Sequence, residues 1–159
     1  KPTILRPGGV TFENIKRIVD NVEMHSSIAK EEEQINKPKS PGMKYKHYSP
    51  NAELIIIMGE MGKVSDKINE LFKEYQNKNV RTGILATEQT NHCYDCKDLI
   101  VMGDRENPAT IASNLYKAFR DFDKRGVEVI LAESIGYNDM RLAITNRMMK
   151  ASEHNIVKV

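Results

Sequence analysis

This sequence of 159 residues has few cysteines, no long apolar run and a small net charge. Two cysteines and no apolar leader are typical of a reducing compartment and exclude a disulfide framework, so we expect a cytoplasmic protein. The longest apolar run, Leu54–Met58, is far too short to cross a bilayer. A net charge of +2 offers no clustered excess of Lys and Arg, so we predict no membrane partner and no direct nucleic-acid binding.

From Glu53 onward, continuous apolar runs alternate with segments of helical periodicity. Apolar strands of this kind are buried on both faces, which indicates a parallel sheet covered by helices on each side. The sequence therefore predicts an α/β fold, a Rossmann-like three-layer sandwich with a mostly parallel sheet of four or five strands. The expected strands are Leu54–Met58, Arg81–Ala86, Asp98–Met102, Val127–Ala132 and an edge strand Ile156–Val159, and the expected helices are 62–77, Pro108–Lys124 and Asn138–Ser152.

The first twenty residues have a different character. Thr3–Leu5 is typical of the end of a strand, and Thr11 is a candidate N-cap for a short amphipathic helix that reaches about Val19. Such a piece cannot bury its apolar face alone, and the chain begins at Lys1 without a Met, so we expect a fragment of a larger domain. The charges and helix breakers of Asn21–Ser40 predict a mobile, solvated linker.

Two candidate sites are weak as chemical motifs. The turn Gly59–Ser65 lacks both the three-glycine dinucleotide fingerprint and the spacing of a P-loop, so an ordinary tight turn is favoured over an anion site. His92, Cys93 and Cys96 offer soft ligands, but the sequence has no second cysteine pair and a strand follows the first one. Loop cysteines without a special role are favoured over metal or redox chemistry.

The last predicted helix carries Asn146, Arg147 and Lys150 near its end. Cations in a last helical turn complement the helix dipole, and they usually stay solvated. We therefore expect these side chains to be solvated rather than part of a site.

The segment Ser40–Pro50, with the sequence SPGMKYKHYSP, differs from the rest of the chain in kind. Its prolines and glycine restrict the backbone before any ligand binds, which lowers the entropic cost of ordering. Lys44 and Lys46 can neutralise phosphate charge, and the two tyrosines and the histidine of the segment can stack or donate hydrogen bonds. This chemistry suggests a loop that faces a phosphate or nucleotide, and a basic linker that packs on its own domain is the alternative.

This segment closely resembles the linker motif of the long-form, two-domain threonylcarbamoyl-AMP synthases, with Lys46 in place of Arg and Ser49 in place of Ala. Thr3–Gly8 is similar to the final strand and turn of that family's YrdC-like catalytic domain. The C-terminal Gly136, Ala143, Asn146, Arg147, Lys150 and Ala151 are similar to the last helix of its accessory domain. The resemblance implies that residues 1–20 end a catalytic domain, 21–50 are a linker with a lid motif, and 51–159 are a Rossmann-like accessory domain.

The resemblance also implies a function for the whole protein. Such enzymes condense L-threonine, bicarbonate and ATP, which is expected to enter with Mg²⁺, into threonylcarbamoyl-AMP and pyrophosphate, and a downstream transferase then modifies tRNA. Arg6 would contact the nucleotide, and the lid residues would close over ATP: Lys44, Tyr45, Lys46, His47 and Tyr48, with Tyr45 and His47 the leading candidates. Lysine at position 46 loses the bidentate contact of arginine.

The same resemblance places the catalytic residues and the substrate cavity upstream of Lys1. We therefore expect no catalytic residue and no metal site in this chain, and no activity of the fragment without the missing N-terminal domain. A nucleotide-sensing or regulatory module is the main alternative. An independent enzyme that uses NAD or S-adenosylmethionine is a third possibility, against which the absent glycine fingerprint argues.

Overall fold

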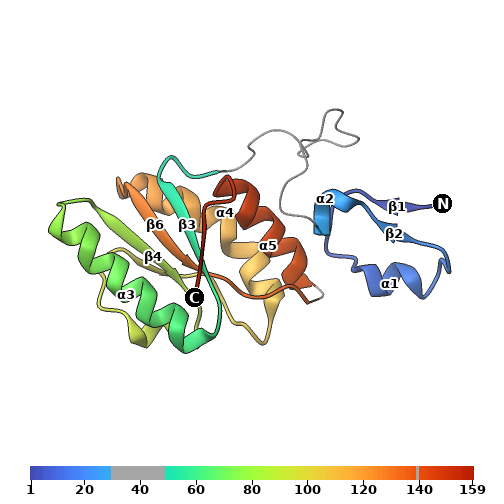
Figure 1. The fold of residues 1–159 in the computed structure, drawn as a ribbon, viewed down its shortest axis with the longest axis horizontal. Coiled ribbons are helices and arrows are strands. Elements are labelled where there is room, and N and C mark those ends of the chain that lie inside the picture. Colours follow the sequence, from blue (N-terminus) through green and yellow to red (C-terminus); the bar gives the residue numbers. More distant parts are fainter. Residues whose placement is uncertain (30–48, 139) are drawn as a thin grey trace.

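The computed structural model describes residues 1–29, 49–138 and 140–159. They form two parts that lie side by side (Figure 1). We call residues 1–29 the N-terminal unit, and residues 49–159 without 139 the five-stranded body.

The body is built on a sheet in which every paired strand runs parallel to its neighbour. The order across the sheet is β5-β4-β6-β3-β7, so β6 and β3 lie in the interior and β7 forms one edge. The fold class and the edge position of the last strand are confirmed. The strands are β3 (Glu53–Met58), β4 (Thr82–Ala86), β5 (Leu99–Val101), β6 (Val129–Glu133) and β7 (Ile156–Lys158).

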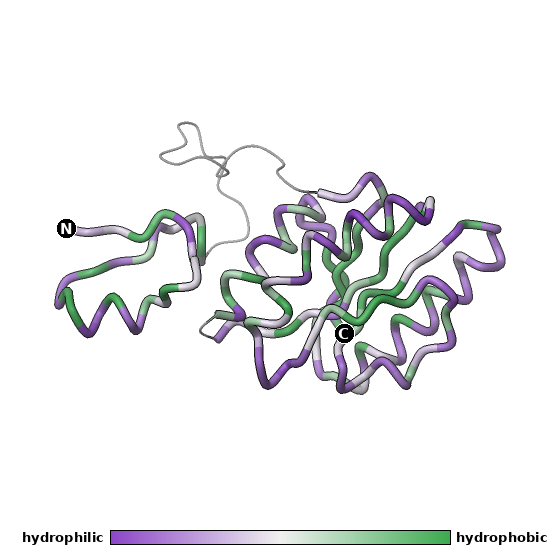
Figure 2. The backbone as a smooth tube through the Cα atoms, turned by 180° about the vertical axis from the view of Figure 1, so that it is seen from behind, coloured by the Kyte–Doolittle hydropathy of each residue, from purple (hydrophilic) through white to green (hydrophobic). Residues whose placement is uncertain are grey.

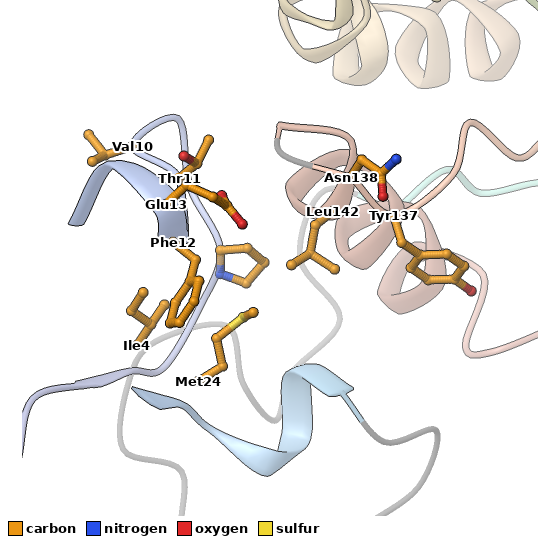
Figure 3. Close-up of a pocket in the computed structure, with 11 residues that line it drawn as sticks. Ile4, Val10, Thr11, Phe12, Glu13, Met24, Tyr137, Asn138 and Leu142 are labelled. Atoms are coloured by element: carbon orange, nitrogen blue, oxygen red, sulfur yellow. The ribbon is translucent and has the colours of Figure 1, made fainter. Parts of the chain in front are cut away.

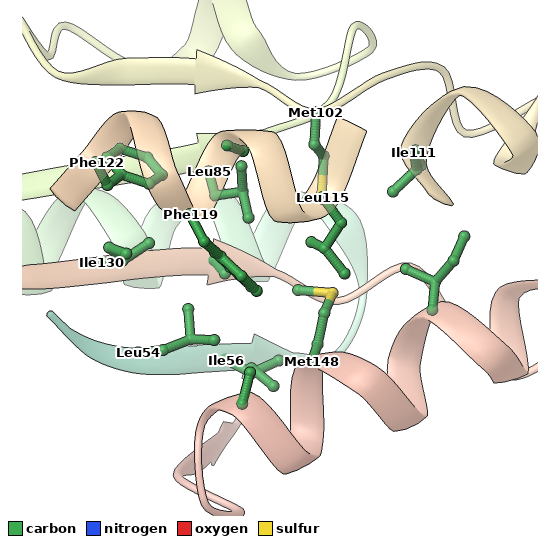
Figure 4. Packing of buried hydrophobic residues seen from close by; sticks show 14 of the residues in the cluster. Leu54, Ile56, Leu85, Met102, Ile111, Leu115, Phe119, Phe122, Ile130 and Met148 are labelled. Carbon is green, nitrogen blue, oxygen red and sulfur yellow. The ribbon is translucent and has the colours of Figure 1, made fainter. Parts of the chain in front are cut away.

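Helices cover both faces of this sheet, as the continuous apolar strands predicted. Alternate residues of β3 point to opposite faces: Leu54 and Ile56 belong to one buried cluster, and Ile55 and Ile57 to the other. The first cluster lies under α4 (Pro108–Lys124) and α5 (Met140–Ala151), and the second under α3 (Met61–Asn77). Figure 4 shows the first cluster, and Figure 2 shows the hydrophobic strands gathered between polar helix surfaces.

The N-terminal unit is a small parallel arrangement of two strands joined by a helix. It contains β1 (Thr3–Ile4), α1 (Phe12–Lys16), β2 (Glu23–Met24) and α2 (Ser26–Ala29). Thr11 caps α1 as expected, since its hydroxyl accepts from the amide of Asn14 at 3.3 Å.

The sequence did not predict β2 or α2. The expectation of a solvated linker from Asn21 onward was wrong for these elements, because β2 pairs with β1 through contacts that lie outside any local pattern. Residues 30–48, which include most of the expected linker, lie outside the described residues. Among the helices that the structure describes, none is both long and apolar enough to span a membrane.

Candidate functional site

A buried polar cluster lies at the carboxyl edge of the sheet, where ligands of parallel α/β folds commonly bind. Its centre is Glu133, the last residue of β6, which is fully buried. Carboxylate Oε1 accepts from the hydroxyls of Thr90 at 2.5 Å and Tyr94 at 2.6 Å. Oε2 accepts from the Thr87 hydroxyl at 3.1 Å and from Arg105 Nη2 at 2.9 Å.

Local structure brings these donors together from two loops, the one after β4 and the one after β5. Thr87 directly follows β4, and a turn closed by the hydrogen bond from the Thr90 amide to the Thr87 carbonyl places both hydroxyls on the same carboxylate. Arg105 lies in the loop between β5 and α4. Its amide donates to Gln89 Oε1 at 3.0 Å, and its carbonyl accepts from Arg141 Nη2 at 2.6 Å.

The electrostatics of the cluster are those of a closed network. A buried carboxylate is tolerated only when it is paired and hydrogen-bonded, and Glu133 receives four donors. Burial, together with the hydrogen bond to Glu133, raises the pKa of Tyr94. The arrangement holds the loops together, and its polar groups satisfy each other rather than face a substrate.

The sequence alone did not predict this cluster. One signal was available: a charged residue ends the apolar run of β6, and threonine directly follows the apolar run of β4. Polar residues at those positions share the carboxyl edge of a parallel sheet.

A second candidate feature is a cavity of about 320 Å³ between the N-terminal unit and the start of α5 (Figure 3). Pro7, Phe12 and Met24 line it from one side, and Leu142 points into it from α5. Glu13 and Asn138 add polar groups to the lining. The cavity therefore lies where the two parts of the chain meet.

The residues expected to hold ATP are only partly within the described structure. Lys44, Tyr45, Lys46, His47 and Tyr48 lie outside the described residues. Arg6 follows β1 and is exposed, and it lies close enough to α5 to affect Lys150 electrostatically. The structure therefore brings Arg6 toward the body.

The expectation that the cations at the end of α5 are solvated was wrong for Lys150. Its side chain is half-buried, and burial, with the nearby charge of Arg6, lowers its pKa. Arg147 and Asn146 are also only partly exposed. The sequence predicted a helix in this region but not the second surface that partly covers these side chains.

The two weaker candidates look ordinary in the structure. Cys96 donates weakly to the Thr82 carbonyl at 3.7 Å, and burial raises the pKa of its thiol. Because the thiolate is the reactive form, a raised pKa makes Cys96 a poor nucleophile. Within the described residues no three His, Cys, Asp or Glu side chains form a possible metal site. At the Gly59 turn, a side chain on Gly59 would collide with the backbone of Val159, so close packing of the chain explains this glycine.

The comparisons with known proteins agree with one another. A family model described as the C-terminal domain of threonylcarbamoyl-AMP synthase matches residues 10–153. The threonylcarbamoyl-AMP synthase of Pyrococcus abyssi is 37% identical over 158 residues, which are 99% of this chain and 44% of the relative. The Bacillus subtilis enzyme of the same name is 38% identical over 157 residues, 99% of this chain and 43% of the relative. The chain thus spans less than half the length of these relatives.

Solved structures give the same result. The crystal structure of P. abyssi Sua5 in complex with L-threonine matches 99% of this chain and 44% of its own, with a TM-score of 0.86 and 36% identity. A P. abyssi Sua5 variant, with a histidine and the tyrosine directly after it both changed to alanine, has a TM-score of 0.87, 35% identity, and coverage of 99% and 43%. A C-terminal Sua5 domain from Pyrococcus horikoshii is matched over its full length and covers 70% of this chain, with a TM-score of 0.56 and 36% identity.

Proposed function

The chain belongs to the family of threonylcarbamoyl-AMP synthase C-terminal domains, and on this premise we propose that it is the C-terminal part of a cytoplasmic two-domain enzyme. The whole enzyme condenses L-threonine, bicarbonate and ATP into threonylcarbamoyl-AMP and releases pyrophosphate. A separate transferase then passes the threonylcarbamoyl group to an adenosine of tRNA. The match of the family model to residues 10–153 carries this proposal.

Three parts of the chain have separate roles in this proposal. Residues 51–159 form the Rossmann-like accessory domain, which is supported by the P. horikoshii domain that covers a similar share of the chain. The N-terminal residues are the end of the YrdC-like catalytic domain. We extend that end from residue 20 through β2, because β2 pairs with β1. The residues between them, up to Pro50, form the linker.

The linker carries the residues that act on ATP. Lys44 and Lys46 neutralise phosphate charge, and Tyr45, His47 and Tyr48 stack on the nucleotide or donate hydrogen bonds to it. The alanine variant of P. abyssi Sua5 supports this assignment, because His47 and Tyr48 are the one His-Tyr pair in this chain. Arg6 contacts the nucleotide from the catalytic domain, and Mg²⁺ enters with ATP as part of the substrate.

A closing linker has a clear chemical purpose. The product is a mixed anhydride of a carbamate and a phosphate, and water would hydrolyse it. A segment that covers the site excludes water while the intermediate is present. Anchoring that segment between two domains lets it move without leaving the enzyme.

The rival function, a nucleotide-sensing module, is less well supported. The carboxyl edge of the sheet is where such a module would bind its ligand, and there the four donors of the cluster are engaged by Glu133. The turn at Gly59 packs against Val159 and has no phosphate-binding fingerprint. The same two features argue against an enzyme that uses a nicotinamide cofactor or S-adenosylmethionine.

The experiment measures threonylcarbamoyl-AMP by mass spectrometry, with pyrophosphate release as a second readout. We expect product from the full-length enzyme and none from residues 1–159 alone. The double variant His47→Ala and Tyr48→Ala should lower kcat/KM for ATP by about tenfold to a hundredfold, since misplacing substrate contacts costs on this order. His92→Ala, an exposed histidine on the body, is the matched control and should retain activity.

Two results would contradict the proposal. Product made by residues 1–159 alone would mean that the chain contains its own active site. Submicromolar binding of ATP or ADP to residues 51–159, measured by calorimetry, would favour the nucleotide-sensing module instead.

A further inference from the structure

The helix α5 differs from the other two helices of the body in how it is covered. Among its twelve residues, all of which are described, none is exposed, whereas α3 and α4 each present several exposed residues. A helix that is covered on all sides is an interior helix and not a surface helix. The sheet and α4 cover only one side of α5, so a second surface must cover the other.

The outward side of α5 is a single row of residues. Leu142, Asn146 and Lys150 are spaced four apart, which places them along one face of the helix. All three are half-buried, while Ala143, Ile144 and Met148 of the same helix belong to the interior of the body. The row therefore faces away from the sheet and is still partly covered.

The N-terminal unit meets this row at both of its ends. At the first end Leu142 points into the cavity that Pro7, Phe12 and Met24 line (Figure 3). At the other end Lys150 lies within electrostatic reach of Arg6, and the nearby positive charge contributes to the lowered pKa of Lys150. Figure 1 shows α5 as the element of the body beside the N-terminal unit.

The N-terminal unit is itself incomplete. No residue of α1 is buried, and the apolar side chains of Val10, Ile18 and Met24 are 65%, 86% and 37% exposed. Exposed apolar side chains grouped on one small unit mark a contact surface. The relatives are more than twice as long as this chain, so they contain the residues that can cover it.

We propose that α5 is the helix through which the five-stranded body docks on the N-terminal domain, with Leu142 as the residue that anchors the contact. The occupant is that domain of the same protein, whose last part is the N-terminal unit. This inference rests on the proposed function for the identity of the domain. Docking fixes the body relative to the catalytic domain, so the accessory domain is a rigid support and not a freely tethered module.

The test uses the full-length protein and hydrogen exchange followed by mass spectrometry. Leu142→Asp places a charge in the apolar contact and should make the backbone amides of residues 4–13 exchange at least about tenfold faster, as expected when a local contact opens. Small-angle scattering should show a larger radius of gyration for this variant. Val101→Asp is the matched control, because Val101 is 40% exposed on the opposite edge strand β5, and it should change neither quantity.

Unchanged exchange of residues 4–13 in a folded Leu142→Asp protein would overturn the inference. Continued protection of β3 and β6 reports that the body is folded. If that protection is lost, Leu142→Ala replaces Leu142→Asp in the test. Leu142→Ala should increase the exchange of residues 4–13 by a smaller factor, and no increase would count against docking. The activity of the wild-type enzyme is a separate readout: absence of threonylcarbamoyl-AMP would refute the proposed function and leave the exchange result valid.

Discussion

Arg105 donates from Nη2 to the carboxylate of Glu133 at 2.9 Å and thereby ties the loop after β5 to the end of β6. The two side chains are 17% and 1% exposed, so the ion pair is shielded from water. Arg105 also donates from Nε to the Thr87 hydroxyl at 3.0 Å, which connects the same loop to β4. These two contacts of Arg105 join the loop after β5, the end of β4 and the end of β6.

Removal of Arg105 is expected to destabilise the body strongly. Arg105→Met leaves the buried Glu133 carboxylate without its cation, and such a loss costs about 3 kcal/mol or more in the free energy of unfolding. Urea denaturation measures this cost. Arg120→Met on the exposed side of α4 is the control and should change stability by less than about 0.5 kcal/mol. The double variant with Glu133→Gln should recover part of the loss, and additive costs would contradict the pairing.

Loss of the Tyr94 hydroxyl should have a smaller effect that depends on pH. Tyr94→Phe removes a hydrogen bond to buried Glu133 and should cost about 1–2 kcal/mol near neutral pH. Because the folded pKa of Tyr94 is raised, its contribution is fully present below the unfolded value of about 10 and is lost as the pH rises toward the folded value. The stability difference between wild type and variant should therefore narrow above about pH 10 in alkaline denaturation experiments. A constant difference would contradict this assignment.

The ion pair between Arg81 and Asp98 predicts the opposite pH dependence. Arg81 Nε donates to Asp98 Oδ2 at 2.9 Å, and this contact lowers the pKa of Asp98. A lowered folded pKa stabilises the protein above the unfolded value of about 3.9, and the contribution disappears as the pH falls through the folded value. The stability advantage of wild type over Asp98→Asn should therefore shrink below about pH 4.

Urea denaturation between neutral and strongly acidic pH measures this change. Asp66→Asn, which removes an exposed carboxylate of α3, is the control. A wild-type advantage that stays the same in strong acid would show that Asp98 stabilises the fold by some means other than its charge.

Close packing at Gly83 predicts a further destabilising substitution. A Cβ on this residue of β4 would lie 2.5 Å from Cε1 of Phe122, a fully buried residue of α4. Gly83→Ala should therefore cost about 1–3 kcal/mol, the usual cost of overpacking a core. Thermal or urea denaturation measures it, and pairing it with Phe122→Leu should recover part of the loss. An unchanged or higher stability of Gly83→Ala would mean that the ring can move aside freely.

Most elements of the body were predictable from the sequence because their signals are local. The helix Pro108–Lys124 has the bounds that its apolar spacing and Pro108 indicated, and β3 follows the apolar run Leu54–Met58 within one residue. Asn107 occupies the cap position, but its side chain makes no capping hydrogen bond. Burial on a helix or strand repeats with a fixed period, and this period is written in the sequence.

The candidate sites could be predicted only in part. The linker motif identifies the family by its own residues, without reference to the fold. The Glu133 cluster depends on loops after β4 and β5 meeting at the end of β6, and the order β5-β4-β6-β3-β7 is not a local property of any segment. The same reason explains the unexpected strand β2 and the partial burial of Lys150.

By itself the sequence determined the family, the succession of the main strands and helices in the five-stranded body, and the parallel sheet covered on both faces. Its few cysteines, short apolar runs and small net charge first limited the classes of protein to which it could belong. Only the tertiary structure decided which polar side chains meet at the carboxyl edge and which surface covers the outer row of α5. These features depend on contacts between residues far apart in the chain, and long-range packing rather than local periodicity selects them.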